Sequence, residues 1–281
     1  MKANPLLAKI PSSNDVKVVA HDYEGDGPTV IFCHATGFHG RYWDHVCLAM
    51  KSMYRCISID FRGHGDSEMP EGTSMRWSGM AEDLLAVVDH FNLDKVYGVG
   101  HSMGGSSILL AAKERPQIFE ALWLFEPIVV PMGPFSEKLS RGNDLASSAR
   151  KRREHFASHE EAFQRYVSRP PFSTVDPEAL RTYVDYGFSY HEDGSVVLKC
   201  RGEIEAQVFE NSSTELFELL SSIDIVTTIV GSSDQEGPAM IAPHIAEELS
   251  KGSFKLLSGL THFAPMEDPA RVAESIIDSF N

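Results

Sequence analysis

The chain has little positive charge and no long apolar run. Its 281 residues include 25 lysines and arginines against 40 aspartates and glutamates, which gives a formal net charge of −15. A nucleic acid or an anionic membrane would need a basic face, so we expect neither as a partner. No run approaches the length of about eighteen apolar residues that a membrane span needs, and the first residues lack the apolar core of a signal peptide. We therefore expect a cytoplasmic protein.

The four cysteines show no metal-ligand spacing. Three of them lie in apolar stretches, which favours reduced and mostly buried thiols in a reducing compartment. The cysteines are Cys33, Cys47, Cys56 and Cys200. We expect neither a bound metal nor a cofactor.

Short apolar runs alternate with amphipathic runs along the first half of the chain. Periodicity predicts strands for the former and helices for the latter. The predicted strands are residues 16–23, 29–33, 55–60, 95–99 and 120–125, and the predicted helices are 42–51, 74–91 and 102–115. Continuous apolar strands that alternate with helices are typical of a parallel sheet buried on both faces. The pattern resumes late in the chain with strands at 225–230 and 254–257 and helices at 240–249 and 269–280.

Residues 131–222 interrupt this pattern. The segment is helix-rich and charged, with breaks at prolines. We interpret it as a helical lid inserted between the late strands of a core formed by residues 1–130 and 223–281. Ligands bind at the carboxyl edge of the strands in open α/β sheets, and a lid over that edge excludes water.

The sequence Gly-His-Ser-Met-Gly-Gly at residues 100–105 lies between a predicted strand and a predicted helix. This is the G-x-S-x-G pattern of a sharp strand-to-helix turn that exposes a serine above the sheet. Side chains at positions 100 and 104 would clash in such a turn, and glycine avoids the clash. Ser102 is therefore a candidate nucleophile. The backbone N–H of Met103, at the helix start, is a candidate donor to an oxyanion.

A serine nucleophile needs a base, and the base needs a group that orients it. Of the 12 histidines, His262 lies on the loop between the last predicted strand and the final helix. That loop belongs to the sheet edge where we expect Ser102. Two carboxylates stand at strand ends as candidate acids. Asp234 follows the strand at 225–230, and Glu126 ends the strand at 120–125. The sequence favours Asp234 and keeps Glu126 as the alternative.

The loop after the strand at 29–33 is the expected source of a second oxyanion donor. We assign the backbone N–H of Thr36 to this role and a structural role to His34. Aromatic residues of this loop and of the lid are expected to line the substrate pocket, although aromatics at helical spacing also form lid cores. The expected substrate-binding residues are Phe38, Trp43, Phe172 and Tyr186.

Residues 150–154 read Arg-Lys-Arg-Arg-Glu and form the only dense basic cluster of the sequence. We interpret the cluster as a solvated face of a lid helix. The alternative is that it binds an anionic group of the substrate.

Five motifs stand in the order typical of the α/β-hydrolase superfamily, which the chain resembles over nearly its whole length. The motifs are residues 34–38 with Trp43, residues 60–67 (Asp-Phe-Arg-Gly-His-Gly-Asp-Ser), residues 100–105, residues 231–234, and His262 with Pro265, Glu267 and Pro269. The resemblance implies a catalytic triad, an oxyanion hole at Met103 and Thr36, and an inserted lid. Two positions depart from the usual pattern. Alanine rather than glycine follows His34, and threonine rather than glycine precedes His262. Both departures affect the path of a loop.

The resemblance implies an α/β-hydrolase fold, with a mostly parallel central sheet flanked by helices. We expect a serine hydrolase that resembles carboxylesterases and cleaves an ester, thioester or lactone of a small to medium apolar substrate through an acyl-enzyme. In related haloalkane dehalogenases a glutamate placed like Glu126 serves as the acid, but dehalogenases and epoxide hydrolases of this fold use an aspartate nucleophile, which Ser102 argues against. The alternatives are a carbon–carbon bond hydrolase or lyase and a non-catalytic ligand receptor. We expect a monomer or a homodimer.

Overall fold

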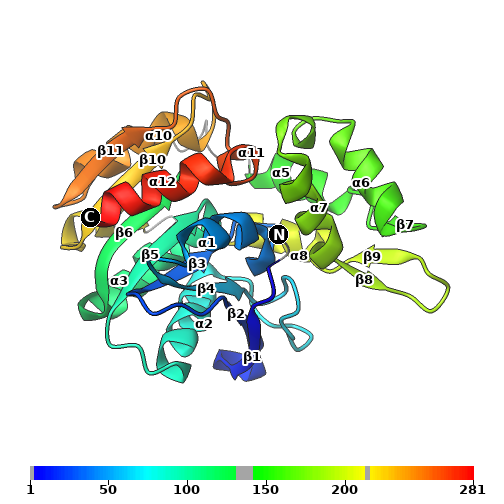
Figure 1. The fold of residues 1–281 in the computed structure, drawn as a ribbon, viewed down its shortest axis with the longest axis horizontal. Coiled ribbons are helices and arrows are strands. Elements are labelled where there is room, and N and C mark those ends of the chain that lie inside the picture. Colours follow the sequence, from blue (N-terminus) through cyan, green and yellow to red (C-terminus); the bar gives the residue numbers. More distant parts are fainter. Residues whose placement is uncertain (1–2, 131–141, 213–215) are drawn as a thin grey trace.

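An eight-stranded, mostly parallel sheet forms the centre of the molecule (Figure 1). The computed structural model describes residues 3–130, 142–212 and 216–281. The strands β1 and β2 and the strands β2 and β4 pair antiparallel, and all later neighbours pair parallel. In spatial order the strands are β1 (Leu6–Pro11), β2 (Lys17–Asp22), β4 (Arg55–Asp60), β3 (Thr29–Cys33), β5 (Val96–His101), β6 (Phe119–Phe125), β10 (Val226–Gly231) and β11 (Gly252–Leu256).

Helices cover both faces of this sheet, and each face has its own apolar core. Side chains alternate along β3, so Val30 and Phe32 enter one core while Ile31 and Cys33 enter the other. The core of Ile31 contains residues of α2, α3 and α10, and the core of Val30 contains residues of α1 and α12. These helices are α1 (Asp44–Met50), α2 (Trp77–His90), α3 (Met103–Glu114), α10 (Pro238–Glu248) and α12 (Pro269–Phe280). The predicted burial of the sheet on both faces is confirmed.

The chain leaves the sheet after β6 and returns at β10. Between them lie helices and a small antiparallel sheet of order β7-β9-β8, green to yellow in Figure 1. We call residues 142–222 the insertion. Its elements are α5 (Gly142–Arg150), β7 (His155–Phe156), α6 (His159–Val167), η4 (Phe172–Thr174), α7 (Pro177–Gly187), β8 (Phe188–Tyr190), β9 (Val196–Leu198), α8 (Gly202–Glu210), α9 (Leu216–Leu219) and η5 (Leu220–Ser222). The predicted lid begins at residue 131, and residues 131–141 lie outside the described residues.

Two features of the fold were not predicted. The strands of the insertion have two or three residues each, too few to show an alternating pattern. The edge strand β1 has only one partner and exposes Leu6 and Leu7, so its sequence lacks the continuous burial of the inner strands. The remaining short helices are η1 (Ser13–Asp15), η2 (Gly40–Trp43), η3 (Pro116–Ile118) and α11 (Ala264–Glu267). In the described part of the chain, no helix has the length and apolarity to cross a membrane.

Candidate active site

Ser102 lies in a strained turn between β5 and α3. Its backbone has φ 55° and ψ −120°, a conformation that a residue with a side chain rarely adopts. The flanking glycines make the turn possible. A Cβ at Gly100 would lie 2.6 Å from the Cα of Gly105, and one at Gly104 would lie 2.3 Å from the carbonyl oxygen of Cys33. The packing of β5 and β3 against α3 therefore requires glycine at both positions.

The imidazole of His262 is hydrogen-bonded to the carboxylate of Glu126. The distance from His262 Nδ1 to Glu126 Oε2 is 2.5 Å, and the other oxygen of Glu126 accepts the backbone N–H of Ser232 at 2.6 Å. Glu126 is fully buried. Burial by itself raises the pKa of Glu126, but His262 and the Ser232 donor outweigh it, so the pKa lies below its usual range. The carboxylate is therefore ionised at neutral pH.

Asp234 approaches His262 from another side. Its Oδ2 accepts the backbone N–H of His262 at 2.8 Å, while its own N–H donates to Ser232 Oγ at 3.2 Å. Asp234 thus holds the loop that carries His262, and the structure differs here from the sequence-based preference for Asp234 as the partner of the ring. The reason lies in the sheet. Glu126 follows β6, the neighbour of β5, and its backbone turns at φ 45°.

The loop after β3 is fixed through its backbone. The N–H of Gly37 donates to His64 Nε2 at 3.2 Å, and the N–H of Phe38 donates to the carbonyl of Ala35 at 3.1 Å. The hydroxyl of Tyr183 donates to the carbonyl of Gly37 at 3.3 Å. Among the hydrogen bonds of the described residues, none uses the N–H of Thr36. That N–H remains available to a ligand.

The same holds at the start of α3. Met103 is the first residue of this helix, so its N–H has no carbonyl partner inside the helix. No hydrogen bond in the described ranges uses it. The positive end of the helix dipole adds to this donor and favours a negative oxygen nearby.

Two buried histidines, His34 and His64, form hydrogen bonds with the loop after β3. His34 Nε2 accepts the N–H of Phe61 at 3.1 Å, and its Nδ1 lies 2.8 Å from the carbonyl of Ala35. In His64 the Nδ1 lies 2.9 Å from the carbonyl of Arg62, while Nε2 accepts from Gly37. Each ring therefore uses Nε2 as an acceptor and Nδ1 as a donor. Burial lowers the pKa of both histidines, which keeps the rings in this neutral form.

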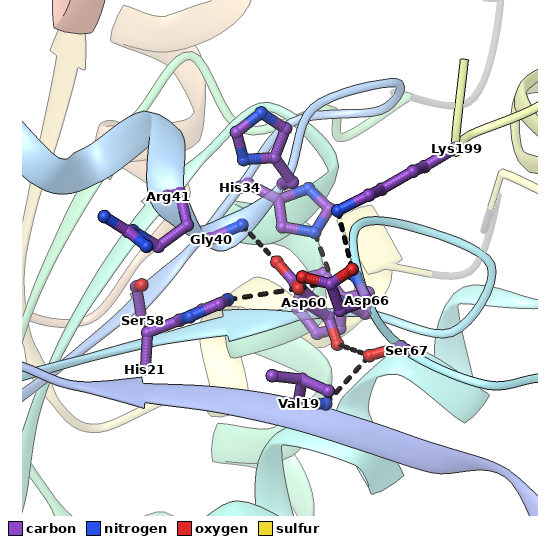
Figure 2. A network of polar contacts seen from close by, with 12 residues as sticks. Val19, His21, His34, Gly40, Arg41, Ser58, Asp60, Asp66, Ser67 and Lys199 are labelled. Carbon is purple, nitrogen blue, oxygen red and sulfur yellow. Dashed lines mark hydrogen bonds and ion pairs between the residues drawn. The ribbon is translucent and has the colours of Figure 1, made fainter. Parts of the chain in front are cut away.

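Asp60 connects the loops after β3 and β4 (Figure 2). Its carboxylate accepts the backbone N–H of Gly40 at 2.6 Å and that of Asp66 at 2.8 Å, and His21 Nε2 lies 3.1 Å away. The side chain is buried, which would raise its pKa, yet His21 and the backbone donors hold the pKa far below the usual range. The charged Asp60 therefore fixes the loop that carries Thr36.

A cavity of about 1120 Å³ opens over Ser102 and His262. Thr36, Phe38 and Phe172 are among its lining residues, and the rings of Phe38 and Phe172 lie 6.4 Å apart between centroids. Phe38 belongs to the loop after β3 and Phe172 to the insertion. The structure thus brings together the predicted nucleophile, base, loop donor and two of the predicted aromatic wall residues.

Two predicted wall residues lie elsewhere. Trp43 is fully buried in the core, with its ring 5.4 Å from that of Phe32 and 4.6 Å from that of Tyr42. Tyr186 lies beneath the guanidinium of Arg41, at 3.7 Å, beside a separate small pocket. Both assignments to the substrate pocket are corrected. An aromatic residue next to a loop motif packs equally well inward, and the sequence does not distinguish the two directions.

Several polar residues in or near the site were not among the predicted site residues. The ring of His101 lies 4.6 Å from that of His262, and its Nδ1 is 2.8 Å from the hydroxyl of Tyr42. His101 belongs to the glycine-rich hexapeptide, which was the available signal. Arg152 and Glu205 line the cavity. The position of Arg152 differs from the solvated face expected for the basic cluster and agrees with the alternative that the cluster faces a ligand. Within the described residues, no group of three or more histidine, cysteine, aspartate or glutamate side chains is placed to hold a metal ion.

Residues 30–275 match the alpha/beta hydrolase family. The chain belongs to this family. It is 26% identical over 267 residues to a bifunctional esterase/perhydrolase of Acinetobacter calcoaceticus, a match that covers 90% of this chain and 91% of that protein. It is 34% identical over 84 residues to 3-oxoadipate enol-lactonase 1 of Acinetobacter baylyi, and there the match spans only 30% of this chain and 31% of the relative.

Solved structures resemble the whole fold. An E-2-(acetamidomethylene)succinate hydrolase superposes with a TM-score of 0.81 at 17% identity, covering 98% of both chains. A thermophilic esterase from Thermogutta terrifontis superposes with a TM-score of 0.74 at 21% identity, covering 97% of both chains. At such identities the likeness concerns the fold, and the α/β-hydrolase fold expected from the sequence is confirmed.

Proposed function

We propose that the chain is a serine hydrolase that cleaves a carboxylic ester, thioester or lactone through an acyl-enzyme. The observation that carries this proposal is the arrangement around one cavity. The buried carboxylate of Glu126 holds the ring of His262, and Ser102 stands in a strained turn at the same cavity. In this proposal Ser102 is the nucleophile, His262 the base and Glu126 the acid. Asp234 positions the backbone of His262.

The reaction follows from these positions. The Nδ1–H of His262 donates to Glu126, which leaves Nε2 free to take the proton of the Ser102 hydroxyl. The serine oxygen then forms a bond to the carbonyl carbon, and the negative carbonyl oxygen binds the N–H groups of Thr36 and Met103. His262 returns the proton to the leaving group as its bond to carbon breaks. A water molecule releases the acyl group by the same steps.

The cavity walls support a small to medium substrate with an apolar part. Phe38 and Phe172 offer aromatic surface beside Ser102. The insertion supplies Phe172 and Tyr183 to this wall, which supports its role as a lid over the core. The family relatives named as an esterase and a lactonase act on acyl groups, in line with this chemistry.

The test is hydrolysis of a short p-nitrophenyl ester. We expect steady turnover by the wild type and no turnover above background by Ser102→Ala. Ser279→Ala is the matched control, because this serine lies on α12, outside the cavity lining, and its hydroxyl donates to the carbonyl of Ser275. Wild-type activity that persists in Ser102→Ala would contradict the proposal. A panel of diketones, with identification of the products, separates acyl transfer from carbon–carbon bond cleavage. Tight binding without turnover would indicate a receptor.

A further inference from the structure

Arg152 places a guanidinium in the wall of the cavity that holds Ser102. It follows α5, and its side chain is only 20% exposed. Among the described residues that line the cavity, Arg152 is the only lysine or arginine. Its neighbours in the basic cluster point elsewhere. Arg150 binds Glu203 and the cavity residue Glu210 but does not itself line the cavity, and Arg153 binds Glu161.

The bonds of Arg152 leave part of its donor capacity unused. Nη1 donates to Glu205 at 2.5 Å, and Nη2 reaches the hydroxyls of Tyr166 and Tyr183 at 3.4 Å each. A guanidinium has five N–H donors, and bonds of 3.4 Å are weak. Burial opposes the charge of Arg152, but Tyr183 and Glu205 raise its pKa above the usual range. Arg152 is therefore a charged group held in place by one strong bond.

This group lies beside the loop that carries Thr36. A Cβ at Gly37 would stand 3.4 Å from Arg152 Nη1 and 2.8 Å from Glu205 Oε1. Gly37 directly follows Thr36, and consecutive Cα atoms are about 3.8 Å apart. One small substrate could therefore place its carbonyl oxygen at the N–H of Thr36 and a second polar group at Arg152, with only a few covalent bonds between the two groups.

The other charges around the cavity are negative. Asp234 and Glu210 lie in the same lining, and neither favours an anionic ligand. Apart from the N–H groups assigned to the oxyanion, an anionic group that enters the cavity therefore has one positively charged side chain to bind among the described lining residues, Arg152. The planar fork of a guanidinium matches a carboxylate with two parallel hydrogen bonds. Glu205 now occupies part of this fork and competes with any incoming carboxylate.

We propose that Arg152 is a specificity residue that binds a carboxylate of the substrate, so that the preferred substrates are half-esters of short dicarboxylic acids or lactones with a carboxylate side group. This inference rests on the proposed function, which it narrows to a substrate class. Glu205 holds Arg152 in position while the site is empty and weakens the binding of the carboxylate by competition.

The test measures binding in Ser102→Ala, where no turnover intervenes. Monomethyl glutarate and dimethyl glutarate differ by one carboxylate, and calorimetry gives a Kd for each. We expect the half-ester to bind about 10- to 100-fold more tightly, the range of a hydrogen-bonded charge pair. Adding Arg152→Gln should remove this preference, and Arg152→Lys should retain part of it. Adding Glu205→Gln should increase the preference. Arg153→Gln is the matched control and should leave the preference unchanged.

Three results would overturn the inference. The first is equal binding of the half-ester and the diester while Arg152 is present. The second is an unchanged preference in Arg152→Gln, with folding verified by circular dichroism. The third is a loss of preference in Glu205→Gln equal to that in Arg152→Gln, since a merely structural ion pair behaves in that way. Failure of the proposed function looks different, because it removes ester turnover and leaves the binding preference intact.

Discussion

Replacing Glu126 by glutamine tests the arrangement of the site most sharply. The change keeps the shape of a fully buried side chain and removes the charge that lies 2.5 Å from His262 Nδ1. In the wild type, the Glu126 carboxylate stabilises the imidazolium that forms when Ser102 gives up its proton. It also selects the tautomer of the His262 ring. Substitution of such an acid by its amide lowers kcat by about 10⁴-fold in serine proteases. We expect kcat for a p-nitrophenyl ester to fall about 10³- to 10⁴-fold, which corresponds to about 4–5.5 kcal/mol.

Asp234→Asn is the control for this prediction. Asp234 accepts a hydrogen bond from the backbone N–H of His262, whereas the imidazole ring is hydrogen-bonded to Glu126. A hydrogen bond to a charged group contributes about 1.5–3 kcal/mol, and the asparagine oxygen still accepts. We expect a decrease of about tenfold or less in kcat, with circular dichroism showing the native fold in both variants. A loss of about 10³-fold in Asp234→Asn, with Glu126→Gln near wild type, would refute the assignment of Glu126.

Three further predictions concern the framework of the site. Asp60→Asn should lower the free energy of unfolding by about 1–3 kcal/mol at pH 7. Because the folded pKa of Asp60 lies below the unfolded value, this difference is full above about pH 5 and should shrink as the pH falls through about 4; a difference that grows in acid would contradict it. Arg62→Met should lower the free energy of unfolding by about 3–5 kcal/mol in urea, since it leaves buried Asp83 without its positively charged partner at 2.7 Å, and a loss below about 1 kcal/mol would argue against the pair. Gly104→Ala should abolish ester hydrolysis, because its Cβ would meet a β3 carbonyl oxygen at 2.3 Å, and full activity would show that the turn tolerates a side chain.

The sequence predicted the inner sheet because its strands are buried on both faces. Val30 to Cys33 enter two cores in alternation, so every residue of this run is apolar. The strand β1 was missed since it lies at an edge and exposes Leu6 and Leu7. The other edge strand, β11, was predicted although it exposes Phe254 and Leu256, so exposure at an edge weakens the local pattern without always removing it.

The candidate site was predictable where a motif determines the backbone. Neighbouring elements approach the backbone around Ser102 too closely for a Cβ, so the positions on either side of it require glycine, and this requirement is visible in the sequence. The choice between Glu126 and Asp234 depends on which strand lies next to β5, and strand order is a property of the folded sheet. Both acids follow strands in the sequence, so their spacing alone does not show which carboxylate contacts the ring of His262.

The cavity wall was the least predictable part. Arg152 and Arg153 are adjacent in one basic cluster, yet the former lines the cavity while the latter binds Glu161 at the surface. The direction in which each arginine side chain points depends on how α5 packs against α8. That packing cannot be predicted from the local sequence pattern. The same holds for Trp43, which the fold turns into the core.

The proposed acyl-enzyme requires Ser102 as its nucleophile. Labelling with a fluorophosphonate, followed by intact mass and peptide mass spectrometry, tests this directly. We expect one label per chain, on the peptide that contains Ser102, with no label in Ser102→Ala and much slower labelling in Glu126→Gln. An unlabelled wild-type protein, or a label on another residue, would contradict the role of Ser102 as the nucleophile.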